Sequence, residues 1–306
     1  MGKPTAAAAS SVVDVEIPHL IRTYKCGRIR RLNLSKLVPP AIDPRTGVAS
    51  EDVVVNRVTG LSARLYRPPA AVLSTRQLPL LVYFHGGGFC SGSAFNSTYH
   101  SYLNSLVSET GIQAVSVDYR LAPESPLPAA YDDSWEALCW AIGSRLGREV
   151  FLAGDSAGAN IAHEMGVRLG REGREVEGMA LVHPFFWGRE SIGRESEERK
   201  GVLFQARDAC ELWRLVCPKA VDGLDSPWLN PLVEGGSGLA GLGCRRLIVC
   251  VAGMDILWDR GRAYYEKLVA SGWPGEAELF ESDGVDHGFH LFQRRSVQAA
   301  NLMRRS

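Results

Sequence analysis

A serine flanked by two glycines, where a predicted strand meets a predicted helix, constrains this chain more than any other feature. Residues 150–153 form a short apolar run with the character of a buried strand. Residues 157–171 are rich in helix formers, with Ile161, Met165 and Leu169 spaced every fourth residue. Between them stands Gly154-Asp155-Ser156-Ala157-Gly158. A strand that turns directly into a helix strains the residue at the turn, and glycines beside it let the two elements approach closely. The stretch therefore predicts an exposed Ser156 hydroxyl at the start of a helix.

This five-residue pattern is weak by itself. An ordinary glycine-rich turn can carry the same G-x-S-x-G sequence, whereas with a strand before it and a helix after it the pattern is typical of a nucleophile elbow. The flanking elements favour the elbow, and other stretches of the chain bear on the same choice.

The order of apolar runs and helical patterns predicts the fold class. Strands are predicted over residues 78–84, 114–117, 150–153, 179–182, 247–251 and 278–280. Helices are predicted between them over residues 98–109, 134–144, 157–171 and 260–270. Residues 53–57 and 62–67 alternate as a hairpin around Thr59-Gly60. This alternation is typical of an α/β fold with a mostly parallel sheet and helices on both faces, whose ligands bind beyond the carboxyl ends of the strands.

We expect one domain over residues 1–306, covered by a helical cap made of two segments. Residues 185–243 interrupt the alternation and leave directly from a predicted strand, as segments that cover an active site often do, with a charged helix start expected near residues 194–200. We expect residues 1–14 to be disordered and residues 17–37 to pack as an arm, so that residues 1–45 complete the cap. The aromatic residues of the inserted segment fit either an apolar pocket or ordinary core packing: Phe185, Phe186, Trp187, Trp213 and Trp228.

Composition excludes several classes of partner. The 34 basic and 34 acidic residues balance, so nothing favours nucleic acid or an anionic membrane, and no apolar run has the length of a membrane span. The seven cysteines are scattered without a C-x-x-C pair, which favours reduced thiols. With no signal-peptide pattern at the N-terminus, we expect a cytoplasmic location. Whether two copies form a homodimer is left open.

A glycine-rich loop follows the first predicted parallel strand. It reads His85-Gly86-Gly87-Gly88-Phe89, and three successive glycines can turn their N–H groups toward one point. The tetrahedral oxyanion of acyl transfer needs two or three such donors, which Gly86, Gly87, Gly88 and Ala157 can supply. A phosphate-binding loop is disfavoured, because neither G-K-[ST] nor a G-x-G-x-x-G spacing follows. We expect His85 to hold the loop rather than to carry a proton.

A serine nucleophile needs a base, and the base needs a carboxylate to orient it. His287 lies in a turn-rich loop after the last predicted strand, whereas His290 falls at an apparent helix start. Asp255 follows the strand at residues 247–251 directly, whereas Asp259 begins a helix, where an acid is an ordinary first-turn residue. The sequence therefore predicts His287 as the base and Asp255 as the orienting acid.

These motifs, in this order, resemble the hormone-sensitive-lipase branch of the α/β-hydrolases. The resemblance rests on the His85 loop, on Asp118-Tyr-Arg-Leu-Ala-Pro-Glu124, on residues 154–160, and on the Asp255 and His287 segments. More narrowly, residues 80–130 and His183-Pro-Phe-Phe-Trp-Gly188 are similar to plant carboxylesterases.

The resemblance implies a serine carboxylesterase that acts on small-molecule esters with neither a cofactor nor a metal. The family's catalytic residues fall on Ser156, Asp255 and His287, and its oxyanion hole falls on Gly86, Gly87, Gly88 and Ala157. It further suggests that Arg120 and Glu124 pair to hold the loop under the site. The chain departs from the family in a short connection at residues 144–150 and in a short C-terminal segment.

Two other functions remain open. Similar plant proteins use the same pocket as a dehydratase, a lyase acting on a flavonoid, and the motifs alone do not exclude this. A related gibberellin receptor binds its hormone without hydrolysis. The presence of His287 disfavours that interpretation, since a receptor would be expected to lack the base.

Overall fold

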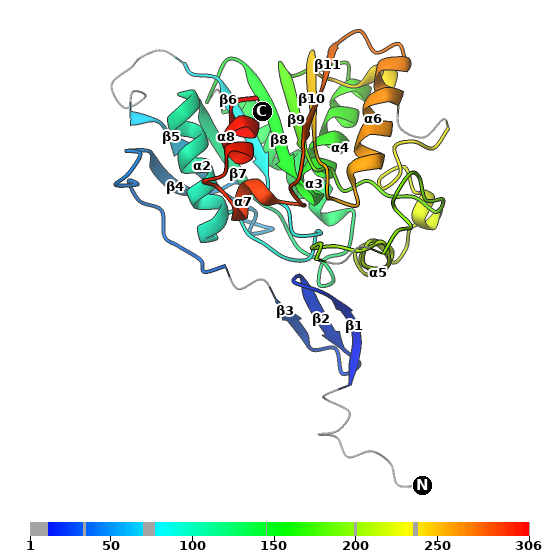
Figure 1. The fold of residues 1–306 in the computed structure, drawn as a ribbon. Helices are drawn as coiled ribbons and strands as arrows, with labels where there is room; N and C mark the ends of the chain where they lie inside the picture. Colours follow the sequence, from blue (N-terminus) through cyan, green and yellow to red (C-terminus); the bar gives the residue numbers. More distant parts are fainter. Residues whose placement is uncertain are drawn as a thin grey trace, which may run out of the picture.

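An eight-stranded sheet forms the centre of the molecule (Figure 1). The computed structural model describes residues 12–32, 35–69, 77–144, 146–198, 201–234 and 238–305. The strand order is β11-β10-β9-β8-β6-β7-β5-β4. The strands are β4 (Ala49–Val54), β5 (Ser62–Arg67), β6 (Leu80–Phe84), β7 (Gln113–Asp118), β8 (Val150–Asp155), β9 (Gly178–Val182), β10 (Arg246–Ala252) and β11 (Glu276–Ser282).

The sheet is parallel from β7 to β11, and β5 and β4 add an antiparallel edge. Every predicted strand is present, most of them one to four residues longer than predicted. The predicted α/β fold with a mostly parallel sheet is therefore confirmed.

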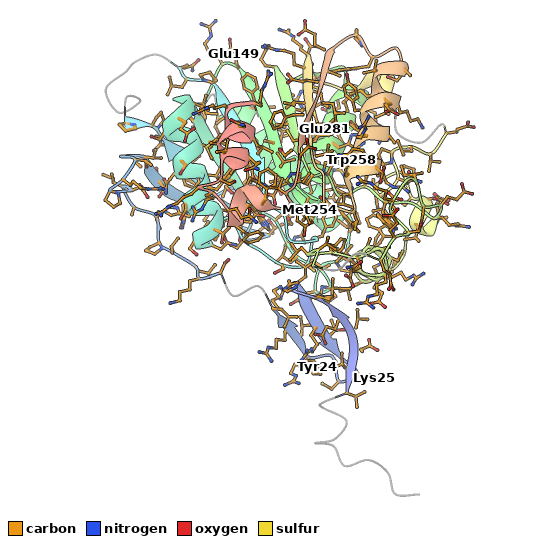
Figure 2. The ribbon with its side chains drawn as sticks, viewed as in Figure 1. Tyr24, Lys25, Glu149, Met254, Trp258 and Glu281 are labelled. Atoms are coloured by element: carbon orange, nitrogen blue, oxygen red, sulfur yellow. The ribbon has the colours of Figure 1, made fainter. Side chains whose placement is uncertain are left out.

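The register brings the carboxyl ends of the central strands together. Phe84 of β6 pairs with Gly154 of β8, and Asp155 pairs with Val182 of β9. Val182 in turn pairs with Cys250 of β10. The loops that follow these four strands therefore leave from one edge of the sheet, where an α/β fold places its ligand. Figure 2 shows this polarity, because Glu149 before β8 and Met254 after β10 lie toward opposite edges.

Helices cover both faces of the sheet (Figure 1). One face carries α3 (Ala129–Gly143), α4 (Ala157–Arg171) and α6 (Trp258–Ala270), and the other carries α2 (Ser97–Thr110), α7 (Phe289–Phe292) and α8 (Val297–Arg305). Strand β6 shows why both faces are buried: Leu80, Val82 and Phe84 join the core on the α3–α4 side, and Leu81 and Tyr83 join the core beneath α2.

The helix limits follow local signals. The side chain of Asn96 caps α2 by accepting the Tyr99 N–H, and Gly111 ends the helix with a φ of 70°. The helix predicted from residue 134 begins earlier, at Ala129. Short as it is, α8 buries Ala299 and Leu302 beside β11.

A separate three-stranded antiparallel sheet lies beside the edge where the central strands end (Figure 1). It consists of β1 (Val13–Ile17), β2 (Ile21–Tyr24) and β3 (Ile29–Arg31). Tyr24 and Lys25 mark its far end in Figure 2. The expectation of disorder up to residue 14 is wrong for residues 13 and 14, which lie in β1, while residues 1–11 lie outside the described residues.

The inserted segment is mostly irregular. Its α-helix among the described residues is α5 (Ala206–Val216), which contacts β1. The helix start expected near residues 194–200 is wrong for the described part of that stretch, because residues 194–197 form a turn and a bend, while residues 199 and 200 lie outside the described residues. Glu195, within this stretch, forms a buried ion pair with Arg260 of α6, at 2.7 Å. Among the described residues, the helices include none long and apolar enough to cross a membrane.

Candidate active site

Ser156 stands at the turn between β8 and α4. Its φ of 55° is rare for a residue with a side chain, and the strain is held by backbone hydrogen bonds from Ser156 N–H to Val182 O and from Phe185 N–H to Ser156 O. A Cβ on Gly154 would collide with the backbone of Gly158, and one on Gly158 with the backbone of Phe84. Both glycines are thus needed for the strand and the helix to approach, as the sequence pattern predicts.

Asp255 and His287 meet on loops from two neighbouring strands. Asp255 follows β10, and His287 lies between β11 and α7. The Nδ1 of His287 lies 2.6 Å from Oδ2 of Asp255, and Oδ1 of Asp255 accepts the Leu257 N–H at 3.0 Å. Because the ionised carboxylate only accepts hydrogen bonds, His287 donates from Nδ1, and in the neutral ring Nε2 is left as a proton acceptor.

The charge of Asp255 acts on the titration of His287. Burial by itself would lower the pKa of the imidazole, but the buried carboxylate of Asp255 and its hydrogen bond, together with the charges of Asp155 and Asp286, raise the pKa above its usual value. The pair therefore favours a ring that readily takes up a proton.

Asp259 and His290, the alternatives for the orienting acid and the base, lie on helices and do not form this pair. Asp259 lies in the first turn of α6 and accepts the Arg194 N–H at 2.9 Å, which ties the inserted segment to the helix. His290 is buried in α7, where burial lowers its pKa to about 4, so the ring is neutral.

Ser156 and His287 line the same cavity, which has a volume of about 410 Å³. Its apolar lining comes from the N-terminal sheet, from the inserted segment and from α7, and includes Leu20, Leu32, Phe185, Leu203, Phe204, Leu212, Leu291 and Phe292. Of the aromatic residues of the insertion, Phe185 and Phe204 therefore border the cavity, whereas Phe186, Trp187 and Trp213 belong to the core. A second hollow, of about 510 Å³, lies on the α2 side of the sheet and contains none of the predicted site residues.

The N–H groups of the glycine loop are not equivalent, because that of Gly86 is hydrogen-bonded within the protein. The Gly86 N–H donates inward, to Tyr99 Oη at 2.7 Å and to Asp155 Oδ1 at 3.1 Å. This N–H is already occupied, so Gly86 does not suit the oxyanion hole predicted for it. Gly87 and Gly88 have φ values of 109° and 62° and border the cavity.

The carboxylate of Asp155 is a site feature that sequence reasoning missed. It is buried beside Ser156 and accepts hydrogen bonds from Tyr83 Oη at 2.7 Å and Tyr99 Oη at 2.8 Å, in addition to Gly86 N–H. Burial and the charge of Asp155 raise the pKa of both phenols, so both act as donors. The signal in the sequence was the acid directly before Ser156, whose partners lie 56 to 72 residues away in the chain.

His85 has a structural place in the loop. Its Nδ1 lies 2.7 Å from Gly86 O, and its ring stacks on Tyr119 with centroids 4.2 Å apart. Tyr119 Oη also donates to His85 O at 2.7 Å. Burial lowers the pKa of His85, so the ring stays neutral and holds the loop.

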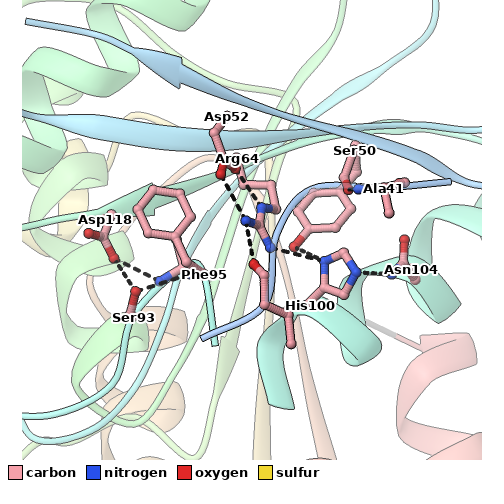
Figure 3. Close-up of polar contacts among 12 residues, drawn as sticks. Ala41, Ser50, Asp52, Arg64, Ser93, Phe95, His100, Asn104 and Asp118 are labelled. Atoms are coloured by element: carbon pink, nitrogen blue, oxygen red, sulfur yellow. Dashed lines mark hydrogen bonds and ion pairs between the residues drawn. The ribbon is translucent and has the colours of Figure 1, made fainter. Parts of the chain in front are cut away.

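The expected pair of Arg120 and Glu124 is wrong. Arg120 forms a bidentate pair with the buried Asp133 of α3, at 2.7 Å, and Glu124 pairs with Arg31 of β3, at 2.8 Å. The two partners, Asp133 and Arg31, lie on other elements, and the sequence contains no signal for such pairing. Asp118, at the end of β7, accepts from Ser93 Oγ at 2.7 Å and from Ala94 N–H at 2.9 Å (Figure 3).

Figure 3 also shows the contacts of Arg64, which hold the antiparallel edge strands β4 and β5 in place. The buried guanidinium of Arg64 contacts Asp52 at 2.6 Å, Val38 O at 2.8 Å and His100 Nδ1 at 3.3 Å. The strand hydrogen bonds are thus reinforced by side chains some distance from Ser156.

One group of described residues has the composition of a metal site. Donor atoms of His183, Asp255 and His287 lie within 4.8 Å of one another. The carboxylate of Asp255 is already used by His287 Nδ1 and Leu257 N–H, and Nδ1 of His183 accepts the Gly288 N–H. These hydrogen bonds account for the cluster without a metal ion.

The chain matches the family described as having the alpha/beta hydrolase fold over residues 81–291, and it belongs to that family. Among curated proteins it is 40% identical to "Probable carboxylesterase 4, mitochondrial" of Arabidopsis thaliana, over 97% of this chain and 83% of the relative. It is 38% identical to "2-hydroxyisoflavanone dehydratase" of Glycyrrhiza echinata, over 100% of this chain and 98% of that protein. A solved esterase from Pyrobaculum calidifontis superposes with a TM-score of 0.72 and 30% identity, covering 84% of this chain and 82% of that one. The resemblance to plant carboxylesterases is confirmed.

Proposed function

We propose that the chain is a serine carboxylesterase with Ser156 as nucleophile, His287 as base and Asp255 as the acid that orients the base. The observation that carries the proposal is the 2.6 Å contact of Asp255 with His287, which lines the same cavity as Ser156. The relatives named as carboxylesterases and the solved esterase support the same reaction.

The reaction follows from this placement. Ser156 Oγ attacks the ester carbonyl as Nε2 of His287 takes the hydroxyl proton, and Asp255 stabilises the resulting imidazolium. The C–O bond of the ester breaks as the imidazolium returns the proton to the departing alcohol. Water, deprotonated by His287, then attacks the acyl-enzyme, and Ser156 leaves with that proton as the acid is released.

The oxyanion formed in both steps needs donors in fixed positions. We assign the N–H groups of Gly87, Gly88 and Ala157 to it. Gly86 N–H keeps its structural hydrogen bonds. Ala157 is the first residue of α4, where the backbone N–H groups have no acceptor within the helix, and this supports its assignment.

We also propose that the N-terminal sheet and the inserted segment together form the cap of this site. The apolar side chains of Leu20 and Leu32 from the first segment and of Leu203 and Leu212 from the second line the cavity. Apart from Asp155, whose carboxylate is engaged by Tyr83, Tyr99 and Gly86, no Asp, Glu, Lys or Arg lines this cavity among the described residues. A neutral, apolar ester of small size fits these walls best.

Hydrolysis of p-nitrophenyl acetate, butyrate and octanoate by the wild type and by Ser156→Ala tests the proposal. We expect turnover that the substitution abolishes, with a chain-length preference that reflects the cavity. Equal turnover by both proteins would show that Ser156 is not the nucleophile.

A dehydratase is the second candidate, because a relative with that name matches the whole chain. The same base and oxyanion donors suit removal of a proton next to a carbonyl. Incubation with a 2-hydroxyisoflavanone, followed by product analysis, separates the two reactions: loss of water indicates the lyase, and no change together with ester turnover indicates the hydrolase.

For the compartment, we propose the cytoplasm. Cys90, Cys217, Cys244 and Cys250 are buried thiols, which suits a reducing environment. The mitochondrial relative makes an organelle the competing location. A C-terminal fluorescent fusion of the full chain, imaged in plant cells, distinguishes diffuse from organellar signal.

A further inference from the structure

The backbone at the end of β9 is hydrogen-bonded both to the turn at Ser156 and to β10, the strand before Asp255. Val182 O accepts the Ser156 N–H at 2.9 Å, and Phe185 N–H donates to Ser156 O at 3.0 Å. Between them, His183 N–H donates to Cys250 O at 2.8 Å, within the strand that leads to the orienting acid. This short segment therefore contacts the nucleophile turn and β10 at once.

The side chain of His183 contacts the loop that contains His287. Its Nδ1 accepts the Gly288 N–H at 3.2 Å, directly after His287 in the chain. The rings of His183 and His287 lie 5.7 Å apart, and donor atoms of both lie within 4.8 Å of an oxygen of Asp255. Gly288 has a φ of 69°, so the bond lies at the turn that follows the base.

His183 accepts this bond only as a neutral ring. Burial, with the neighbouring His290 and His287 adding to it, keeps the pKa of His183 well below its usual value. With Nδ1 as acceptor, the ring proton is on Nε2, which is buried without a hydrogen-bond partner among the described residues. His183 also has a φ of 47°. A buried unpaired donor and a strained backbone both cost stability, and such costs cluster at functional sites.

We propose that His183 is a positioning residue for His287: its imidazole holds the Gly288 N–H and thereby fixes the place of the neighbouring ring. The catalytic part of this inference rests on the proposed function. The structural part, the effect of His183 on the contact between His287 and Asp255, does not.

Two substitutions separate the hydrogen bond from the bulk of the ring. In His183→Asn the side-chain oxygen lies near the position of Nδ1 and can accept the same N–H, and asparagine tolerates a positive φ. In His183→Leu the acceptor is lost. His163→Leu is the matched control, because His163 is also buried and neutral, is hydrogen-bonded to Tyr264 of α6, and does not line the cavity.

The kinetic readout is the separate measurement of kcat and KM for a p-nitrophenyl ester. For His183→Leu we expect kcat to fall by about 10- to 100-fold with KM within about twofold, because misplacing a catalytic group acts on the chemical step. His183→Asn should retain most of the wild-type kcat. His163→Leu should lower the melting temperature and leave kcat near the wild-type value.

The second readout is the proton NMR resonance of the hydrogen bond from His287 Nδ1 to Asp255, which we expect far downfield in the wild type. It should shift or broaden in His183→Leu and stay in place in His183→Asn and His163→Leu. This measurement needs no substrate, so it still tests the positioning if the wild type hydrolyses no ester.

A folded His183→Leu protein with wild-type kcat and an unmoved resonance would overturn the proposal. If the leucine variant does not fold, His183→Asn is compared with His183→Gln, whose acceptor lies one carbon farther out. The proposal expects the glutamine variant to lose activity and the resonance while the asparagine variant keeps them, and equal behaviour of the two would overturn it.

Discussion

The carboxylate of Asp155 lies 3.1 Å from the backbone nitrogen of Gly86 and so links the nucleophile turn to the glycine loop. The two residues are 69 positions apart in the chain. Because Asp155 precedes the proposed nucleophile and Gly86 precedes the proposed oxyanion donors, this one contact sets the distance between the two halves of the reaction.

Replacing Asp155 by asparagine should therefore damage catalysis. The amide keeps the size of the side chain but offers one oxygen to three donors, so Tyr83 or Tyr99 loses its acceptor. We expect kcat to fall by about 10- to 100-fold. Asp133→Asn is the matched control, since Asp133 is a buried acid paired with Arg120 away from the cavity. The control should lose stability and keep kcat. An equal fall in kcat for both variants would contradict the role given to Asp155.

Addition of a methyl group at Gly88 should reduce activity more than stability. A Cβ there would lie 2.8 Å from Leu212 Cδ2 and 3.0 Å from Leu20 Cδ1, at a φ of 62°. Gly88→Ala thus pushes a cap side chain or shifts an oxyanion donor, and loss of one donor costs about 10²–10³ in kcat. Gly111→Ala has a comparable φ of 70° and nothing within 4 Å, so it controls for backbone strain alone. Similar kcat values for the two variants would argue against this placement of the loop.

The titration of His287 should set the acid limb of the pH profile. The base is active when neutral, and Asp255 raises its pKa, so kcat/KM should rise with pH through a midpoint above the usual value for histidine. In Asp255→Asn the largest of the effects that raise this pKa is lost, so the pKa of His287 falls, and the acid limb should move to lower pH while kcat falls.

The raised pKa of His287 should also make the stability of the folded protein depend on pH, and this contribution to stability falls as the pH rises, whereas kcat/KM rises. A pKa that is higher in the folded protein stabilises it fully below the unfolded value, and this contribution is lost as the pH rises through the folded value. Denaturation of the wild type and Asp255→Asn at several pH values measures the difference. If the acid limb of kcat/KM does not move in Asp255→Asn, a group other than His287 titrates there.

Arg31 should hold the N-terminal sheet over the site. Its guanidinium donates to Glu124, to Cys90 O at 2.8 Å and to Ala122 O at 3.3 Å, which joins β3 to the end of the glycine loop. In Arg31→Met we expect KM to rise severalfold, because Leu20 and Leu32 of the cap lose their fixed place, with little change in melting temperature. Arg22→Met is the control, since Arg22 pairs with Glu16 inside the same small sheet. A rise in KM in the control alone would refute this role.

The sequence predicts the parts of this molecule that depend on local patterns. The apolar runs define β6 to β11, and the residues that follow β8 and β10 identify Ser156 and Asp255, because parallel strands end at one edge of a sheet. His287 is found by its position after the last strand.

Features that depend on distant partners could not be predicted. Arg120 pairs with Asp133, and Glu124 pairs with Arg31. In each pair the two residues are separated by loops whose path the sequence does not predict. The N-terminal sheet was missed although β1 alternates apolar and polar residues from Val13 to Ile17, because β1 is largely exposed and β2 and β3 have only four and three residues. The inward direction of the Gly86 N–H follows from two acceptors, Tyr99 on α2 and Asp155 on β8, that no motif connects to it.

The most direct test of the account is mass spectrometry of the intact protein, and then of its peptides, after reaction with a dialkyl aryl phosphate such as paraoxon. Attack by a serine nucleophile expels the phenolate and leaves a stable dialkylphosphoryl group on its oxygen. We predict one such group on the wild type, located on Ser156, and none on Ser156→Ala or in protein denatured beforehand. A group on another residue, or ester turnover that survives in Ser156→Ala, would contradict the assignment of Ser156 as the nucleophile.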